Sequence, residues 1–236
     1  MLIRVLKVGL LAGLVAGLVI ALLQQATTTP LILTAETYEN AGEAKAAAVP
    51  QPGHHHDGHV HQEADGWKPE NGLSRLFYTS VATVVTAVGI SFLLIAAMLL
   101  AGVPIDERRS LAWALAGFVA AGLAPAAGLA PELPGSAAGD LIGRQIWWGG
   151  TALATAAALW MLLRANGLLV RIVAVVLLLA PHVIGAPHPH AFESKVPAEL
   201  AAQFTALSLV VQGLLWVLAG IAVGLLWPRI SPKPAA

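Results

Sequence analysis

The sequence predicts an all-α protein, a polytopic bundle of six transmembrane helices, or of five if one apolar block does not cross the membrane. Of the 236 residues, 57% are hydrophobic and only 11% are charged, whereas soluble domains carry about 25% charged residues. The apolar residues are also gathered into blocks close to the roughly 20 residues that a helix needs to cross a bilayer. A soluble globular domain and a disordered chain are therefore excluded. The 13 basic and 13 acidic residues balance, so charge gives no indication of a nucleic-acid partner.

The apolar blocks form a single integral membrane domain, residues 1–236. The first block follows Arg4 and Lys7, as in a signal peptide, but no small-residue cleavage site comes after it, so we expect a retained span. The third and fifth blocks are weaker, because Pro125 and Pro181 lie near their far ends and Arg171 lies near the start of the fifth. The approximate spans are 8–23, 78–100, 111–129, 146–163, 168–184 and 204–227.

The basic residues predict the orientation, because cytoplasmic segments are enriched in Lys and Arg. With the N-terminus inside, six spans place both termini in the cytoplasm and the long segment 24–77 outside. All eight His, and all acidic residues except Asp106 and Glu107, then fall on the outer side. The inner segments hold Arg4, Lys7, Arg108, Arg109, Arg164, Arg171, Arg229 and Lys233.

The outer segment 24–77 is rich in Pro, Gly and charge, which is typical of disorder. It contains a dense His tract, for which we expect collection of a divalent metal ion, because neighbouring imidazoles chelate Zn, Cu, Ni or Co. Binding should weaken as the imidazoles protonate near pH 6. A solvated linker and an acid sensor remain alternatives. The candidate metal ligands of the tract are His54, His55, His56, His59 and His61.

Three further His lie after a proline-broken block. The pattern Leu-Ala-Pro-x4-Ala-Pro occurs at 123–131 and again at 179–187, through either duplication or chance. Proline lacks a backbone N–H, so it frees a carbonyl one turn earlier, and such an oxygen can bind a cation. We predict His182, His188 and His190 as metal ligands at this outer edge. The alternative for His182 is an interfacial side chain bonded to a carbonyl.

Other patterns predict packing or exclude chemistry. Gly-x-x-x-Gly spacings at 9–17 and 220–224 indicate close helix packing. Gln212, in the last span, marks either a polar path or a bond between helices. The chain has no Cys and none of the P-loop, His-Glu-x-x-His or Gly-x-Ser-x-Gly motifs. We therefore expect no enzymatic activity and no permanently bound cofactor.

Seven short segments, spread over nearly the whole chain, are distinctive in combination. They are Leu22-Leu-Gln-Gln25, Pro30-Leu-Ile-Leu33, Leu123-Ala-Pro125, Pro131-Glu-Leu-Pro-Gly135, Arg144-Gln-Ile-Trp-Trp148, Ala180-Pro-His-Val-Ile-Gly-Ala-Pro187 and Val196-Pro-Ala-Glu-Leu200. Together they resemble the CbtA family of predicted cobalt transporter subunits. The resemblance implies cobalt uptake for cobalamin synthesis in a bacterial inner membrane, with about five spans and a very small, single-span, His-bearing partner of the CbtB type. It implies no particular site residue.

The function predicted from the sequence is transport of a divalent transition metal across the membrane. Cobalt uptake is the first choice, with Co²⁺ as the transported ion and Ni²⁺ as the alternative. The expected partners are the lipid bilayer, the CbtB-type subunit and, as an open option, further copies of the chain. The competing prediction is a membrane-bound protein that binds, senses or assembles metal without transporting it.

Overall fold

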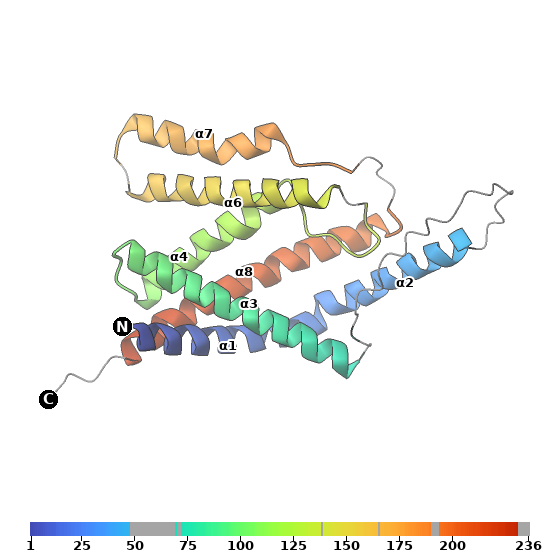
Figure 1. Cartoon of the computed structure of the whole chain (residues 1–236), viewed down its shortest axis with the longest axis horizontal. Helices are drawn as coiled ribbons and strands as arrows, with labels where there is room; N and C mark the ends of the chain where they lie inside the picture. The colour runs from blue at the N-terminus through green and yellow to red at the C-terminus, as the bar shows by residue number, and fades with distance from the viewer. Residues whose placement is uncertain (48–68, 70–71, 138, 165, 190–193, 231–236) are drawn as a thin grey trace, which may run out of the picture.

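The computed structural model describes residues 1–47, 69, 72–137, 139–164, 166–189 and 194–230, with the side chains of 42–47 left out. In this part of the chain every regular element is a helix, so the all-α prediction is confirmed (Figure 1). The elements are α1 (Leu2–Ala26), α2 (Thr28–Ala47), α3 (Leu73–Leu100), α4 (Glu107–Phe118), the π-helix η1 (Val119–Leu123), α5 (Ala124–Ala126), α6 (Leu141–Arg164), α7 (Leu168–Ile184) and α8 (Ala198–Arg229).

Five stretches of helix are long and apolar enough to cross a membrane: α1, α3, the continuous run Glu107–Ala126, α6 and α8. The sixth predicted block, α7, is apolar but has only 17 residues, the lower limit of about 17–25 for a span. The structure therefore confirms a polytopic helical bundle, with five candidate spans and a shorter sixth apolar helix among the described residues.

Asp106 explains why the third span begins earlier than residue 111. Its side chain caps α4 by accepting a hydrogen bond from the backbone N–H of Arg109 at 2.9 Å and a second from the Arg109 guanidinium at 2.7 Å. These interactions, the backbone hydrogen bond first, hold the pKa of Asp106 below its usual value. The cap is therefore charged at neutral pH.

Glycines set the closest helix contacts in the bundle. Gly13 lies directly against the backbone of Val88, so that α1 and α3 pack closely along their length. At the other contact, a Cβ on Gly220 would lie 2.6 Å from the Cβ of Ala114, where α8 packs on α4. Both predicted Gly-x-x-x-Gly patterns are confirmed as packing surfaces. The tightly packed part of the bundle thus consists of α1, α3, α4 and α8.

The two ends of the bundle differ in their side chains. At the end that we call the arginine end, Arg4 donates hydrogen bonds to the carbonyl of Trp227 and stacks on its ring, and Arg164 donates to the carbonyl of Ala101 at 2.5 Å. The opposite end, which we call the α2 end, carries α2 and the segments before α6 and α8 (Figure 1). His182, in the last turn of α7, and His188, which follows that helix, lie at the α2 end.

Segment 24–77 departs from the sequence prediction. The prediction of a mostly disordered segment is wrong for Thr28–Ala47, which forms α2. Pro30 sits in the first turn of this helix, where no N–H is needed, and Ala35 is buried against Leu133 and Val196. The chain also becomes helical at Leu73, before the predicted start of the second span. The His tract 54–61 lies outside the described residues.

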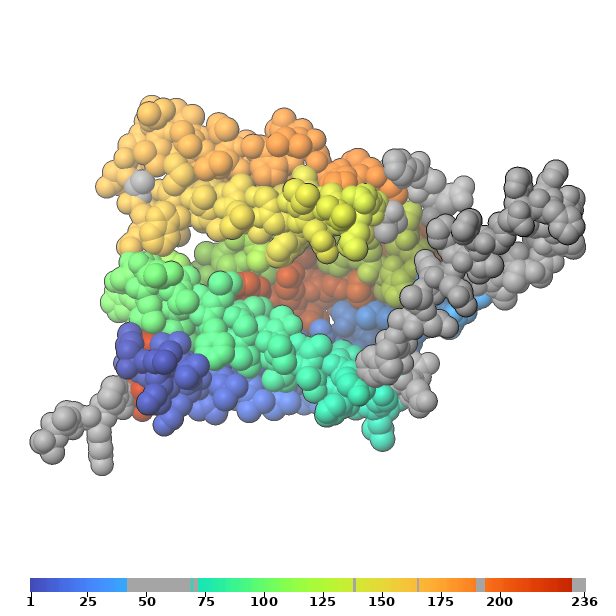
Figure 2. Space-filling model, viewed as in Figure 1, coloured from blue at the N-terminus to red at the C-terminus, as the bar shows by residue number. Residues whose placement is uncertain are grey.

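Helices α6 and α7 form a hairpin that stands apart from the rest of the bundle. Among the described helices, α7 packs on α6 alone, and α6 reaches the others mainly through η1 and α5. No described contact joins α6 to α3, and the space-filling view shows a recess between them (Figure 2). The recess is lined by side chains of α3, α4, η1, α6 and α8.

Candidate functional site

His182 lies in a constellation that joins the ends of α6 and α7. The indole N–H of Trp147 donates a hydrogen bond to the carbonyl of Pro181 at 3.1 Å. The ring of His182 stands edge-on to the indole, with centroids 5.9 Å apart and an interplanar angle of 73°. Because Pro181 sits inside α7, its turn lacks one backbone donor. An ionisable ring is thereby held at the α2 end of an apolar helix, where a functional role is the default expectation.

The segment after α7 brings His188 back toward the start of α6. A Cβ on Gly139 would lie 3.3 Å from the carbonyl of His188, and one on Gly143 would lie 3.5 Å from the ring of Pro187. His188 itself is exposed. The third predicted ligand of this group, His190, lies outside the described residues, as do all five His of the tract.

Carboxylates gather at the same α2 end, and three of them, Glu36, Glu132 and Asp140, accept from a basic or backbone donor. Glu132 pairs with Arg144 at 2.6 Å, and Glu36 pairs with Arg75 at 2.8 Å. The second pair borders a hollow of about 420 Å³ that Glu39 also lines. These pairs join residues 12 and 39 positions apart in the chain, and no sequence pattern predicted them. The surface is therefore rich in oxygen ligands that are held by structural bonds.

The described side chains do not form a closed metal site. In the described ranges, no three His, Asp or Glu side chains come close enough together to hold one ion. Co²⁺ and Ni²⁺ accept imidazole and carboxylate ligands, so His182 and His188 can each supply one ligand at most to a loosely held, partly hydrated ion.

A row of side chains begins at this constellation and continues along α6 towards the middle of that helix. Trp147, Thr151 and Thr155 are spaced four residues apart and so share one face of the helix. Both threonines are fully buried. The Thr151 hydroxyl donates to the carbonyl of Trp147 at 2.8 Å, whereas the buried Oγ1 of Thr155 has no hydrogen-bond partner among the described residues. Sequence analysis missed this row because isolated threonines in an apolar block carry no signal.

The π-helix η1 packs beside α6. It runs from Val119 to Leu123 and is followed by Pro125, so one carbonyl of this turn lacks a backbone donor. On the side toward α8, a Cβ on Gly122 would lie 2.8 Å from the amide oxygen of Gln212. Gln212 therefore lies against the irregular turn. π-turns of this kind occur frequently at functional sites.

A family model described as "Probable cobalt transporter subunit (CbtA)" matches residues 2–228 of the chain. Neither the curated proteins nor the solved structures gave a match. The match covers every described helix except the last residue of α8.

Proposed function

Since this chain belongs to the CbtA family of probable cobalt transporter subunits, we propose that it carries Co²⁺ inward across the bacterial inner membrane. Ni²⁺, which accepts the same ligand types, is the second ion. Both termini lie in the cytoplasm in this proposal, and the α2 end faces outward. The observation that carries the proposal is the constellation of Trp147, Pro181 and His182. In it, an imidazole lies beside Trp147, the residue at which the row of Thr151 and Thr155 begins.

Ions are collected at the α2 end before they reach the constellation of Trp147, Pro181 and His182. The collectors are His188, His190 and the tract His54, His55, His56, His59 and His61, together with the carboxylates of the same end. Positive-inside orientation supports this arrangement, because Arg4 and Arg164 lie at the opposite end. The ion exchanges rapidly because single imidazoles and carboxylates hold it, rather than a closed set of ligands.

The route then follows α6 and the helical turns that contain Pro125 and Pro181. The Thr151 and Thr155 hydroxyls and the carbonyls around Pro125 and Pro181 are oxygen ligands in otherwise apolar surroundings. The membrane potential can drive the ion: at −100 mV inside, a dication gains about 4.6 kcal/mol on inward passage. The chain has no P-loop of its own.

The word subunit in the family description implies a partner. We propose that this partner is a CbtB-type protein, a single span bearing His, and that it supplies ligands that this chain does not group together. Additional copies of the chain are the other source of ligands. The lipid bilayer surrounds the assembly.

A second candidate is a membrane-bound metal-binding, sensing or assembly protein that does not itself transport. The observation that favours it is the lack of His, Asp or Glu side chains in the middle of the five described spans. Accumulation of radiolabelled cobalt in cells that express the chain, with and without the small partner, separates the two. Accumulation above the level of empty cells supports transport, and surface binding alone supports the second candidate.

Replacing His182, His188 and His190 together by glutamine should lower cobalt uptake about tenfold or more, because loss of metal ligands or their supports typically costs 10–100-fold. The measurement is the initial rate of radiolabelled cobalt uptake at low cobalt concentration. The matched control is Lys195→Gln, which changes an exposed side chain at the same end that is not a ligand type. Unchanged uptake in the triple variant, at equal protein level in the membrane, would remove these residues from the route.

The proposed orientation predicts which introduced cysteines can be labelled from outside. The chain has no Cys, so Lys195→Cys at the α2 end and Asn166→Cys at the arginine end are single reporters. A membrane-impermeant maleimide added to intact cells should label Lys195→Cys, and should label Asn166→Cys only after permeabilisation. The reverse pattern would place the His-bearing end in the cytoplasm and would contradict inward transport by this route.

A further inference from the structure

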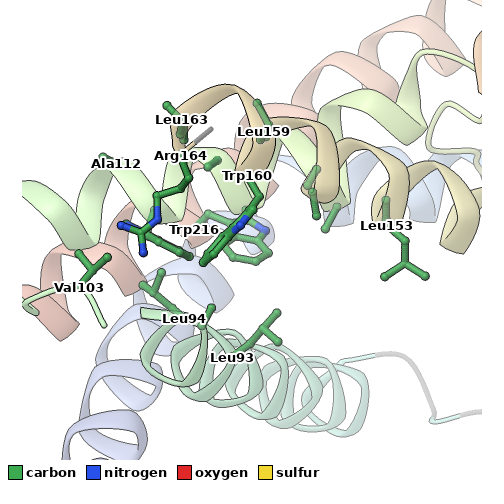
Figure 3. A pocket seen from close by; sticks show the side chains of 18 residues that line it. Leu93, Leu94, Val103, Ala112, Leu153, Leu159, Trp160, Leu163, Arg164 and Trp216 are labelled. Atoms are coloured by element: carbon green, nitrogen blue, oxygen red, sulfur yellow. The ribbon is translucent and has the colours of Figure 1, made fainter. Parts of the chain in front are cut away.

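The recess between α3 and α6 is a groove of about 500 Å³, within the roughly 300–1,000 Å³ typical of small-molecule sites. Its lining is apolar apart from one cation. Leu93 and Leu94 of α3 form one wall, and Leu153 and Trp160 of α6 form the other (Figure 3). Alanines of α4 and η1, with Trp216 of α8, lie between the walls. The groove is thus a slot between membrane-spanning helices.

The cation of the groove is Arg164, at the arginine end of α6. Figure 3 shows its side chain extending into the groove beside Trp160, and the guanidinium lies 5.1 Å from the centre of the Trp160 ring. One of its five N–H donors is used by the carbonyl of Ala101 at 2.5 Å. The ion pairs among the described residues involve Arg75, Arg109 and Arg144 and not Arg164. An apolar slot therefore ends at a guanidinium without a carboxylate partner in this part of the chain.

The two parts of a phospholipid, its acyl chains and its phosphate, match the two features of the groove. The acyl chain suits the apolar walls, and the phosphate suits Arg164, whose planar donors match phosphate geometry. Basic pockets between transmembrane helices are known lipid headgroup sites. A spanning helix, about 10 Å across and roughly 30 Å long, is far larger than the hollow. A spanning helix also offers no negative charge to the guanidinium of Arg164, unless that helix bears an acidic residue at this position.

We propose that the groove between α3 and α6 binds one anionic phospholipid of the surrounding bilayer, with its phosphate on Arg164 and an acyl chain along Leu94, Leu153 and Trp160. The lipid fills the space that separates the α6–α7 hairpin from α3. This site is separate from the proposed metal route, which runs on the face of α6 that carries Thr151 and Thr155.

The test is native mass spectrometry of the full chain, delipidated in mild detergent and titrated with phosphatidylglycerol or phosphatidylcholine. The wild type should retain one phosphatidylglycerol in preference to phosphatidylcholine. Arg164→Gln should weaken retention of phosphatidylglycerol about tenfold, because a charge-assisted bond is lost. Its control is Arg171→Gln, an exposed arginine near the same end that does not line the groove, and it should bind like the wild type.

A second pair of variants tests the slot rather than the charge. Ala156 is exposed and lines the groove, so Ala156→Phe should fill it and also lower retention about tenfold. Ala157, its exposed neighbour, does not line the groove, and Ala157→Phe should bind like the wild type. Thermal unfolding shows whether each variant is folded. The proposal is wrong if the wild type retains no phosphatidylglycerol, or if folded Arg164→Gln or Ala156→Phe retains as much as the wild type.

Discussion

Gly13→Ala should destabilise the bundle by about 1–3 kcal/mol, the usual cost of overpacking. A Cβ at Gly13 would overlap the backbone of Val88, which cannot turn aside as a flexible side chain can. The two helices must therefore separate along α1 and α3, and the buried side chains Ala16 and Ala87 lose contacts. The measurement is thermal unfolding of the purified full chain, followed by the loss of soluble, monodisperse protein on heating.

The bundle offers a matched control on the partner helix. Gly89 of α3 has nothing within 4 Å of the position that a Cβ would take. Gly89→Ala should leave the transition temperature unchanged or raise it, since alanine favours a helix by up to about 1 kcal/mol over glycine. Equal stability of the two variants would show that α1 and α3 do not pack through Gly13 in the membrane protein.

Thr155→Val should raise stability and lower transport. The buried Thr155 hydroxyl has no hydrogen-bond partner among the described residues, and leaving such a group unsatisfied costs about 1–3 kcal/mol. Valine has nearly the same shape and removes that cost, so the transition temperature should rise. If the hydroxyl assists the metal ion inside the bundle, cobalt uptake should fall about tenfold, as for other metal-supporting groups.

Two comparisons make the Thr155 result specific. Thr155→Ser keeps the hydroxyl and should keep most of the uptake. Thr86→Val changes an exposed threonine of α3 whose hydroxyl already bonds to the carbonyl of Ala82 at 2.9 Å, and uptake should be unchanged. A more stable Thr155→Val variant with wild-type uptake would mean that the polar row of α6 lies off the ion's route.

The fold followed from local sequence patterns because membrane spans are local features. Long apolar blocks predicted the helices, and the glycines at 9–17 predicted close helix packing, for which the structure shows α3 to be the partner of α1. Segment 24–77 was the exception, since the short apolar stretch around Ile32 and Ala35 forms a helix that packs on the distant residue Leu133. Composition averaged over the whole segment hid that stretch.

The candidate site was less predictable because it depends on contacts between distant residues. The sequence indicated His182 through its place after Pro181. It gave no sign that Trp147, 34 residues earlier, would bond to the Pro181 carbonyl. The pairing of Glu36 with Arg75 and the widened turn at Val119–Leu123 were equally invisible, since a π-turn differs from an α-helix by a single extra residue per turn.

The isolation of the α6–α7 hairpin determines where this protein can change shape most cheaply. Since α7 touches α6 alone among the described helices, tilting the hairpin as a rigid lever disturbs few contacts other than those of α6 with η1 and α5. The tightly packed helices α1, α3, α4 and α8 would stay in place while the α6–α7 hairpin tilts against them as a rigid body. A tilt of this kind would change the separation of α6 from η1 and α5, while leaving the hydrogen bond between Trp147 and Pro181 within the moving hairpin intact.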